Sequence, residues 1–313
     1  MSRKLLVLGY HNVEPTWAFP GTSASVAVRG FDRQLHALRR WAHVVPLSEA
    51  LTHLAAGRPL PPRAVALTFD DGYRDSATVV APLLARHGLP ATFFLVPGFL
   101  SGRVPVWWEE LAWAVQTGTR ASVVSQDVRY EMLTQEQRHA CVAAVTESLK
   151  RLDQQSRLAA VAELVSGLDP PGPNPSDALF MSWDDAQALL RAGFDIGSHT
   201  CGHPILSNET AASQTRELAG SKAELEARLG RCVDLLAFPN GRAVDYDDRT
   251  LRAVRDCGYA FALTTRTGLA TVDHAPFQVR RVVVGPRTDL RRLVTAGLRT
   301  VKQAARTVFV PHN

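Results

Sequence analysis

The sequence predicts an α/β protein in which strands and helices form a distorted (β/α) barrel of about seven or eight units. Short apolar segments alternate with helical stretches along most of the chain. Strands separated by helices pair in parallel through right-handed crossovers. The 313 residues are enough for two ordinary domains or for one large α/β barrel. The number of strand–helix units favours the barrel over an open sheet.

The elements follow one another at the spacing expected for such units. Strands are predicted at 5–10, 43–47, 64–69, 91–96, 194–197, 235–238, 260–265 and 279–284. Helices are predicted at 31–41, 48–56, 76–86, 183–192, 209–229 and 247–256. The longest of these helices follows Ser207 and Asn208 and stops at Gly230, which are typical start and stop residues.

Residues 97–180 interrupt this alternation. A helical stretch opens at Trp107, a β-prone piece occupies 120–132, and a long helical region is expected at 134–168. We interpret the interruption as a helical insertion on the rim of the barrel and not as an independent domain. The sequence then predicts a single domain over 1–313.

Composition and charge limit the classes of partner. A hydrophobic content of 46% and a charged content of 21% are ordinary for a soluble globular protein. The formal net charge of +5 fits a generic basic surface, or attraction to anionic glycans, lipid phosphates or a membrane face. No run of Lys and Arg is dense enough to indicate nucleic acid. The sequence predicts no particular oligomeric state.

The cysteines and the N-terminus bear on the cellular compartment. The four cysteines contain no Cys-x-x-Cys pair, so a disulfide framework is not expected in a chain of this size. The apolar run after Arg3 and Lys4 is only about four residues long, which is too short for a secretion signal. No segment approaches the roughly 18 apolar residues of a spanning helix. We expect a cytoplasmic protein, with peripheral membrane contact left open.

Two carboxylates and two imidazoles follow predicted strands. Asp70 and Asp71 end one apolar strand, and His199 and His203 follow another. In parallel β/α architectures the carboxyl ends of the strands form the active-site face. Taken alone, Asp-Asp-Gly is also a common turn signal, and a histidine pair is often surface or capping decoration. Together they predict that two strand ends deliver metal ligands to one barrel mouth.

These residue types indicate a catalytic metal centre. Histidines four residues apart lie on one face of a helical turn and can chelate one ion. Two histidines and one aspartate leave coordination positions open, which suits a catalytic rather than a structural metal. Zinc fits this ligand set best, and cobalt, nickel or iron can also bind. The second carboxylate is then left to accept a proton.

The motifs resemble those of the polysaccharide deacetylases, carbohydrate esterase family 4, with the NodB homology domain. The resemblance rests on Thr-Phe-Asp-Asp-Gly at 68–72, on the histidines at 199 and 203, and on Leu-Ala-Phe-Pro-Asn-Gly at 236–241. It extends over roughly 5–285. It implies a distorted barrel and hydrolysis of N-acetyl groups on hexosamines.

The resemblance also implies a role for each matching residue. Asp70 resembles the general base of the family. The residues that resemble its metal ligands are Asp71, His199 and His203. Asn240 occupies the position whose backbone N–H helps stabilise the tetrahedral oxyanion. The alternative for this third motif is a plain strand-ending turn.

The family's general acid, a histidine after a late strand, has no counterpart at that place. His11 follows the first strand instead, and the first and last strands of a closed barrel are neighbours. We hypothesise that His11 is the general acid through circular permutation, since some family members look arranged that way. The alternative is that His11 only packs at the strand end.

The family's third motif also carries an arginine that holds the base, and this sequence lacks it there. Strand alternation places Arg280 and Arg281 on opposite faces, so that one of them can point into the barrel. We favour Arg281, because the resemblance to the permuted-looking family members includes a late arginine followed by aliphatic residues, which Arg281 matches. An interior arginine needs an acidic partner, and Asp70 or Asp71 would serve. The alternative is that both arginines lie at the rim.

The expected function is metal-dependent removal of N-acetyl groups from hexosamine residues of a polysaccharide, an oligosaccharide or its precursor. The positive charge and the expected compartment favour a nucleotide-linked or lipid-linked precursor over mature cell wall. Two alternatives stay open: hydrolysis of another amide, such as an N-formyl group or a ureide, and a catalytically inactive glycan-binding module. Trp107 and Trp108 either stack on a sugar or pack in the core.

Overall fold

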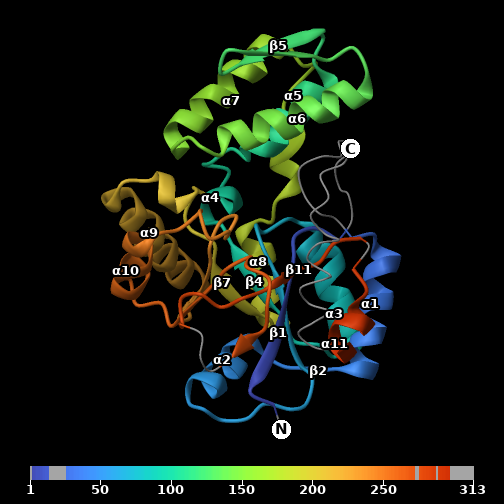
Figure 1. Ribbon diagram of the computed structural model, residues 1–313, viewed down its shortest axis with the longest axis vertical. Coiled ribbons are helices and arrows are strands. Elements are labelled where there is room, and N and C mark those ends of the chain that lie inside the picture. Colours follow the sequence, from blue (N-terminus) through green and yellow to red (C-terminus); the bar gives the residue numbers. More distant parts are fainter. Residues whose placement is uncertain (1, 14–25, 272–274, 287, 297–313) are drawn as a thin grey trace.

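The computed structural model describes residues 2–13, 26–271, 275–286 and 288–296. A curled, mainly parallel sheet lies at its centre with helices around it (Figure 1). The hydrogen-bonded order is β10–β1–β3–β4–β7–β8–β9, with β2 beside β3 and β11 beside β1. The strands are β1 (Lys4–Tyr10), β2 (His43–Val44), β3 (Ala64–Phe69), β4 (Thr92–Leu95), β7 (Asp195–Ser198), β8 (Leu235–Ala237), β9 (Phe261–Leu263), β10 (Ala270–Thr271) and β11 (Val282–Val283). The predicted α/β class is confirmed.

The segment around β11 joins the two ends of the parallel path. Val279 forms a parallel bridge with Leu263 of β9, and β11 pairs with β1 at Leu8 and Gly9. The strand expected at 279–284 is therefore short, because the segment passes from one neighbour to the other. The sheet curls on itself, so that the first strand and this late segment are adjacent.

The strands are buried on both faces. In β1, Leu5 and Val7 belong to a core cluster that also holds residues of α2 (Leu47–Ala55). Leu6 and Leu8 belong to another cluster, which contains residues of the outer helices. This alternation follows from the two-residue period of side chains along a strand. The helix α2 closes the base of the curl (Figure 1), which leaves the carboxyl ends of the strands for a site.

Helices cover the outside of the sheet, with α1, α3 and α11 on one side and α9 and α10 on the other (Figure 1). They are α1 (Val28–Trp41), α3 (Ala81–His87), α4 (Pro97–Leu100), α8 (Trp183–Arg191), α9 (Ala211–Leu229), α10 (Asp248–Asp256) and α11 (Leu290–Ala296). The helix expected at 76–86 begins as a π-helix, Ser76–Val80. The strand expected at 43–47 ends at Val44, because Pro46 cannot donate to a ladder and precedes α2.

The segment between α4 and α8 forms a helical layer beyond one end of the barrel (Figure 1). It comprises α5 (Trp107–Thr117), the hairpin of β5 (Ser122–Ser125) and β6 (Val128–Glu131), α6 (Gln135–Leu149) and α7 (Gln154–Leu168). Its apolar side chains form a core cluster that extends to Tyr73 of the barrel. The single helical region expected at 134–168 is two helices, because the Asp153 carboxylate caps the start of α7. That 1–313 is one domain stays a prediction.

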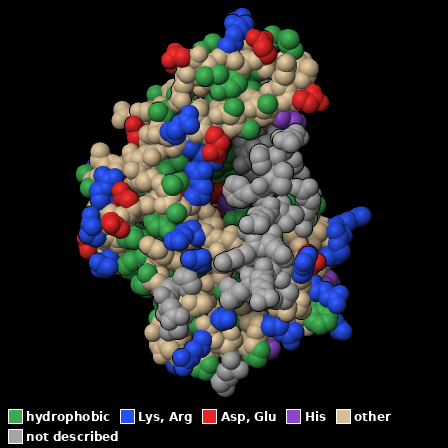
Figure 2. Space-filling model, viewed as in Figure 1, with side chains coloured by type: hydrophobic (Ala, Val, Ile, Leu, Met, Phe, Trp, Pro, Cys, Tyr) green, Lys and Arg blue, Asp and Glu red, His purple; other side chains and the backbone are tan. Residues whose placement is uncertain are grey.

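The surface carries charge of both signs. On the face shown in Figure 2, Lys and Arg side chains are spread over the molecule with Asp and Glu among them, and they do not gather in one patch. No helix within the described ranges is both long enough and apolar enough to cross a membrane.

Candidate metal centre and catalytic groups

Asp70 and Asp71 lie where β3 ends beside β1. The N–H of Asp70 donates to the carbonyl of Tyr10 (2.9 Å), which continues the β1–β3 ladder by one residue. The chain then turns sharply, with φ of 72° at Asp71 and 83° at Gly72. A non-glycine residue in this left-handed region carries strain, which is often found at functional sites. Both aspartates are buried, with 2% and 4% exposed.

His199 and His203 lie on the loop that follows β7. The N–H of His199 donates to the carbonyl of Leu95 (2.9 Å), which continues the β7–β4 ladder. Thr200 and His203 have φ of 68° and 61°, and the N–H of His203 donates to Oγ1 of Thr200 (3.0 Å). The expectation that the two histidines share a helical turn is wrong, because the segment is not helical. A compact loop with two left-handed residues brings them together instead.

Asp71, His199 and His203 converge on one point, and we call this group the metal centre. The Nε2 atom of each histidine lies 3.3 Å from Oδ1 of Asp71. One potential ligand atom from each residue lies within 4.8 Å of the other two. Ligands bound at about 2 Å to a single ion have comparable separations.

Neighbouring elements orient the two imidazoles. Nδ1 of His199 lies 2.7 Å from the carbonyl oxygen of Ala237, the last residue of β8. Because a carbonyl can only accept a hydrogen bond, Nδ1 carries a proton, and in the neutral ring Nε2 is left with a lone pair that can bind a metal. The ring of His203 packs against Trp108 of the insertion at 4.9 Å and against Phe99 of α4 at 6.0 Å, measured between centroids.

The donor set fits a divalent cation. Oδ1 of Asp71 is buried and makes no well-aligned hydrogen bond to any described residue, although both imidazole nitrogens are close. A buried carboxylate oxygen in this state is costly, and a cation shared with the two Nε2 atoms would remove the cost. A neutral His199 with its proton on Nδ1 cannot donate from Nε2. With both imidazoles neutral, three potential electron-pair donors face the same point.

The charges around the metal centre keep both carboxyl groups ionised. Burial alone would raise the pKa of Asp70, but Arg281 and then His199 outweigh it and hold this pKa below its ordinary value. Burial likewise opposes ionisation of Asp71, and the two adjacent histidines hold its pKa well below the ordinary value. The pKa of His199 is raised, because the two aspartates outweigh its burial. Burial dominates at His203 and lowers its pKa.

Arg281 is the buried partner of Asp70. Its Nη1 atom lies 2.7 Å from Oδ1 of Asp70, and the residue is 0% exposed. Its Nε donates to the carbonyl of Thr264 (3.1 Å), and Nη1 lies 3.3 Å from Oγ1 of Thr68. Arg280, by contrast, is half-buried. Of the two alternatives for these arginines, the structure therefore shows the one in which Arg281 points into the barrel.

His11 directly follows β1, as Asp70 directly follows the neighbouring strand β3. Tyr10 pairs with Phe69, so the residues that follow them lie at the same level of the barrel mouth. The imidazole is close enough to help lower the pKa of both Asp70 and Asp71. Its Nδ1 atom is buried and has no hydrogen-bond partner in the part of the chain that the structure describes. The general-acid role and the circular permutation stay predictions.

Asn240 forms the turn after β8 with φ of 58°. Its carbonyl accepts a hydrogen bond from Oγ1 of Thr265 (2.6 Å), which fixes the turn. The turn borders the metal centre, because Ala237 at the end of β8 holds the ring of His199. Stabilisation of an oxyanion by the Asn240 N–H stays a prediction.

The insertion contributes buried polar groups that sequence reasoning missed. Nε1 of Trp108 donates to the hydroxyl of Tyr73 (2.9 Å), which donates to Oε1 of Glu109 (2.7 Å). Trp107 and Trp108 are only 5% and 7% exposed, so both pack in the core. No sequence signal distinguishes Glu109, because an acidic residue in the first turn of a helix is expected for its effect on the helix dipole.

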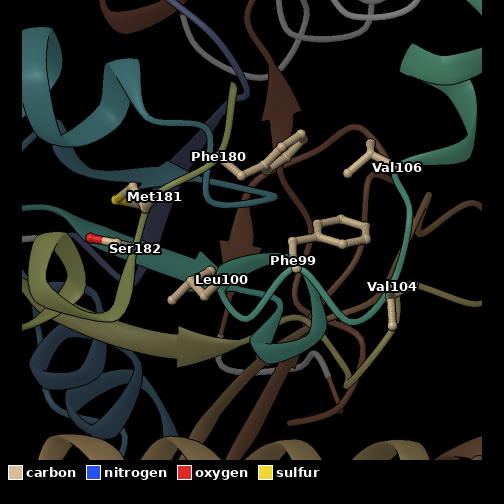
Figure 3. A pocket seen from close by; sticks show the side chains of 8 residues that line it. Phe99, Leu100, Val104, Val106, Phe180, Met181 and Ser182 are labelled. Atoms are coloured by element: carbon tan, nitrogen blue, oxygen red, sulfur yellow. The ribbon is translucent and has the colours of Figure 1, made fainter. Parts of the chain in front are cut away.

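A pocket of about 170 Å³, lined mostly by apolar residues, lies beside these aromatic residues (Figure 3). It is lined by Phe99, Leu100, Gly102, Val104, Val106, Phe180, Met181 and Ser182. Figure 3 shows the rings of Phe99 and Phe180 turned toward Val106. Because Phe99 also packs on His203, the pocket is separated from the metal centre by one aromatic ring.

The sequence profile of the polysaccharide deacetylases matches residues 57–262, which is well over half of the chain. The chain belongs to the polysaccharide deacetylase family. The assignment made from the motifs is thereby confirmed. The matched segment of the chain contains the Asp-Asp-Gly motif and both histidines of the metal centre. His11 and Arg281 lie outside it, yet the fold places both beside Asp70.

Relatives of this chain are similar over most of its length. YxkH of Bacillus subtilis, which is named for the same family, is 23% identical over 288 residues, covering 90% of this chain and 72% of YxkH. The Streptococcus pyogenes deacetylase PplD has a TM-score of 0.63 at 19% identity and covers 93% of this chain and 96% of its own. IcaB from Ammonifex degensii has a TM-score of 0.60 at 20% identity, with 97% and 98% covered. At these identities the solved structures establish the shared fold.

Proposed function

We propose that this deacetylase is a metal-dependent hydrolase that removes N-acetyl groups from hexosamine residues of a saccharide chain or its precursor. One observation carries the proposal: a buried Asp–His–His group lies beside a second carboxylate that is held by an arginine. The family supports deacetylation. The donor set supports a divalent ion, for which zinc fits best and cobalt, nickel or iron are alternatives.

Asp71, His199 and His203 would hold the ion. A divalent ion bound there supplies a Lewis acid that polarises the acetamide and makes water more acidic. The protein supplies fixed ligand directions, because His199 is held by β8 and His203 by the aromatic residues of the insertion and α4. Ligands fixed in this way need no reorganisation when substrate binds.

Four groups around the metal centre share the proton transfers and the developing charge. Asp70 accepts a proton from the attacking water, whose oxygen bonds to the carbonyl carbon. Arg281 keeps Asp70 ionised and fixed in place. The N–H of Asn240 donates to the oxyanion. His11 donates a proton to the amide nitrogen as the C–N bond breaks, which yields acetate and a free amino sugar.

Acetate release from N-acetylglucosamine oligomers by the zinc-loaded protein tests this function. Asp70→Asn is the matched control, because it keeps the shape of the side chain and removes the base. We expect the variant to bind zinc and to release acetate about 10²–10⁴-fold more slowly. Equal rates for the two proteins would exclude the proposed role of Asp70.

The same assay separates the alternative functions. N-formylated and ureide substrates are offered in parallel with the acetylated oligomers. Faster release of formate or ammonia than of acetate would assign the centre to another amide. Binding of the oligomers with no product from any substrate would indicate a glycan-binding module. A nucleotide-linked or lipid-linked substrate, peripheral membrane contact and a cytoplasmic location stay predictions.

A further inference from the structure

A second group of metal-ligating side chains lies between α1 and α3. Asp32 and His36 are four residues apart on α1 and therefore share one face of that helix. His87 is the last residue of α3. One potential ligand atom of each residue lies within 4.8 Å of the other two. The group shares no residue with the metal centre and lies among the helices outside the sheet (Figure 1).

The three side chains are already in contact. Oδ1 of Asp32 lies 2.9 Å from Nε2 of His87, and the rings of His36 and His87 meet edge to face with centroids 4.6 Å apart. The His87 side chain is only 7% exposed, and its Nδ1 atom is buried with no hydrogen-bond partner among the residues described. The Asp32 side chain is 39% exposed, and His36 is exposed. A cation could therefore reach the group from solvent.

We propose that Asp32, His36 and His87 form a surface site for a divalent transition ion, with zinc foremost, and we name it the α1–α3 site. Two imidazoles and one carboxylate are a donor set that zinc, nickel and copper share, and one that suits Mg²⁺ and Ca²⁺ poorly. Water completes the coordination on the exposed side. The ion ties α1 to α3 and stabilises their packing, and it takes no part in hydrolysis.

A hydrogen bond between Asp32 and His87 is the simpler explanation of part of this geometry. A protonated His87 at the C-terminal end of α3 would complement the helix dipole. That explanation accounts for the contact between Asp32 and His87 but gives no role to the edge-to-face contact between His36 and His87. Two neutral imidazoles around a cation would account for both contacts and for the 4.8 Å limit within which the three ligand atoms lie. The adjacent Arg86 opposes a cation, so we expect weaker binding here than at the metal centre.

Zinc content of the full-length chain tests the site. After removal of metal with a chelator, zinc is added back and the tightly and weakly bound ions are counted by titration. We expect two ions per wild-type chain, one for His36→Ala and one for His203→Ala. His139→Ala, which removes an exposed histidine of α6, is the matched control and should keep two. A wild-type chain with the same zinc content as His36→Ala would overturn the proposal.

Cobalt gives a readout that does not depend on counting. In a His199→Ala, His203→Ala double variant, added Co²⁺ should still produce the visible absorption bands of a nitrogen-coordinated ion. Adding His36→Ala to this background should abolish the bands, whereas adding His139→Ala should leave them. Because His36 is exposed, its replacement does not disturb the core. Bands that are absent from the double variant, or that survive the loss of His36, would refute the α1–α3 site.

Discussion

The metal centre and the α1–α3 site use the same three residue types in opposite surroundings. Every member of the metal centre is at most 8% exposed, and its side chains come from loops at the ends of two strands. The members of the α1–α3 site lie on regular helices, and two of them are accessible to solvent. Residue type alone therefore does not distinguish a catalytic centre from a surface site.

The backbone and the neighbouring groups make the difference. Asp71, Thr200 and His203 have positive φ, whereas no such residue occurs in α1 or α3. Strain of this kind persists only where the surrounding structure imposes it. The metal centre also adjoins a second carboxylate, Asp70, with its own buried arginine. The α1–α3 site has no second described carboxylate in its cluster, so it can bind an ion but offers no base.

Removing one ligand of the metal centre should have the largest effect. We expect His203→Ala to lower acetate release to the level of a protein-free control, because only Asp71 and His199 remain to hold the ion. Zinc content should fall by one ion per chain. Chelation of the wild-type protein should give the same loss of activity, and added zinc should reverse it. Full activity of the metal-free protein would contradict a metal-dependent reaction.

Replacing His11 should lower turnover by about 10²–10⁴-fold while the zinc content stays unchanged. The reason is that a general acid acts on the leaving nitrogen and does not hold the ion. The rate is measured with N-acetylglucosamine oligomers. His43→Ala, which removes an exposed histidine of β2, is the control and should keep the wild-type rate. A similar rate for His11→Ala would leave His11 with a packing role only.

The sequence alone could predict the elements and the ligands, because both depend on local patterns. The run at 64–69 is a strand with the expected bounds, and the two carboxylates follow it. Gly230 ends α9 in a left-handed conformation, as its residue type indicates. The histidine pair was predicted as a chelating pair, but its local backbone was not. Two left-handed non-glycine residues are not visible in a pattern of apolar spacing.

Long-range contacts were harder to predict. Arg281 could be assigned to the interior only as one of two alternatives, because alternation does not say which face of a strand is buried. Its contact with Asp70 depends on the curl that places β11 beside β1. The buried Tyr73–Glu109 hydrogen bond joins the barrel to the insertion, and no spacing rule connects these two residues. The α1–α3 site is similar: Asp32 and His36 share α1, but only the fold brings His87 of α3 beside them.

Replacing Arg281 should affect both stability and rate. Arg281→Ala leaves Asp70 as a buried charge without its partner, which should lower the free energy of unfolding by about 3–5 kcal/mol. Turnover should fall on the order of 10²-fold, because the base is no longer held in place. Arg280→Ala is the matched control on the other face of the same segment and should change both quantities little. Denaturant unfolding and acetate release measure the two effects, and equal behaviour of the variants would contradict the assigned pairing.

His36→Ala should have the smallest effect on catalysis. It should clearly change how much added zinc raises the thermal midpoint of unfolding. We expect acetate release within about twofold of wild type, since the exposed side chain touches none of the groups around Asp70 and a surface substitution changes stability little. Added zinc should raise the thermal midpoint of a His199→Ala, His203→Ala protein, because an ion that binds only the folded state stabilises it. The same protein with His36→Ala added should show no rise.

A large loss of acetate release in His36→Ala alone would mean that the α1–α3 site and the metal centre are coupled. The contrast between a catalytic centre and an independent surface site would then no longer hold.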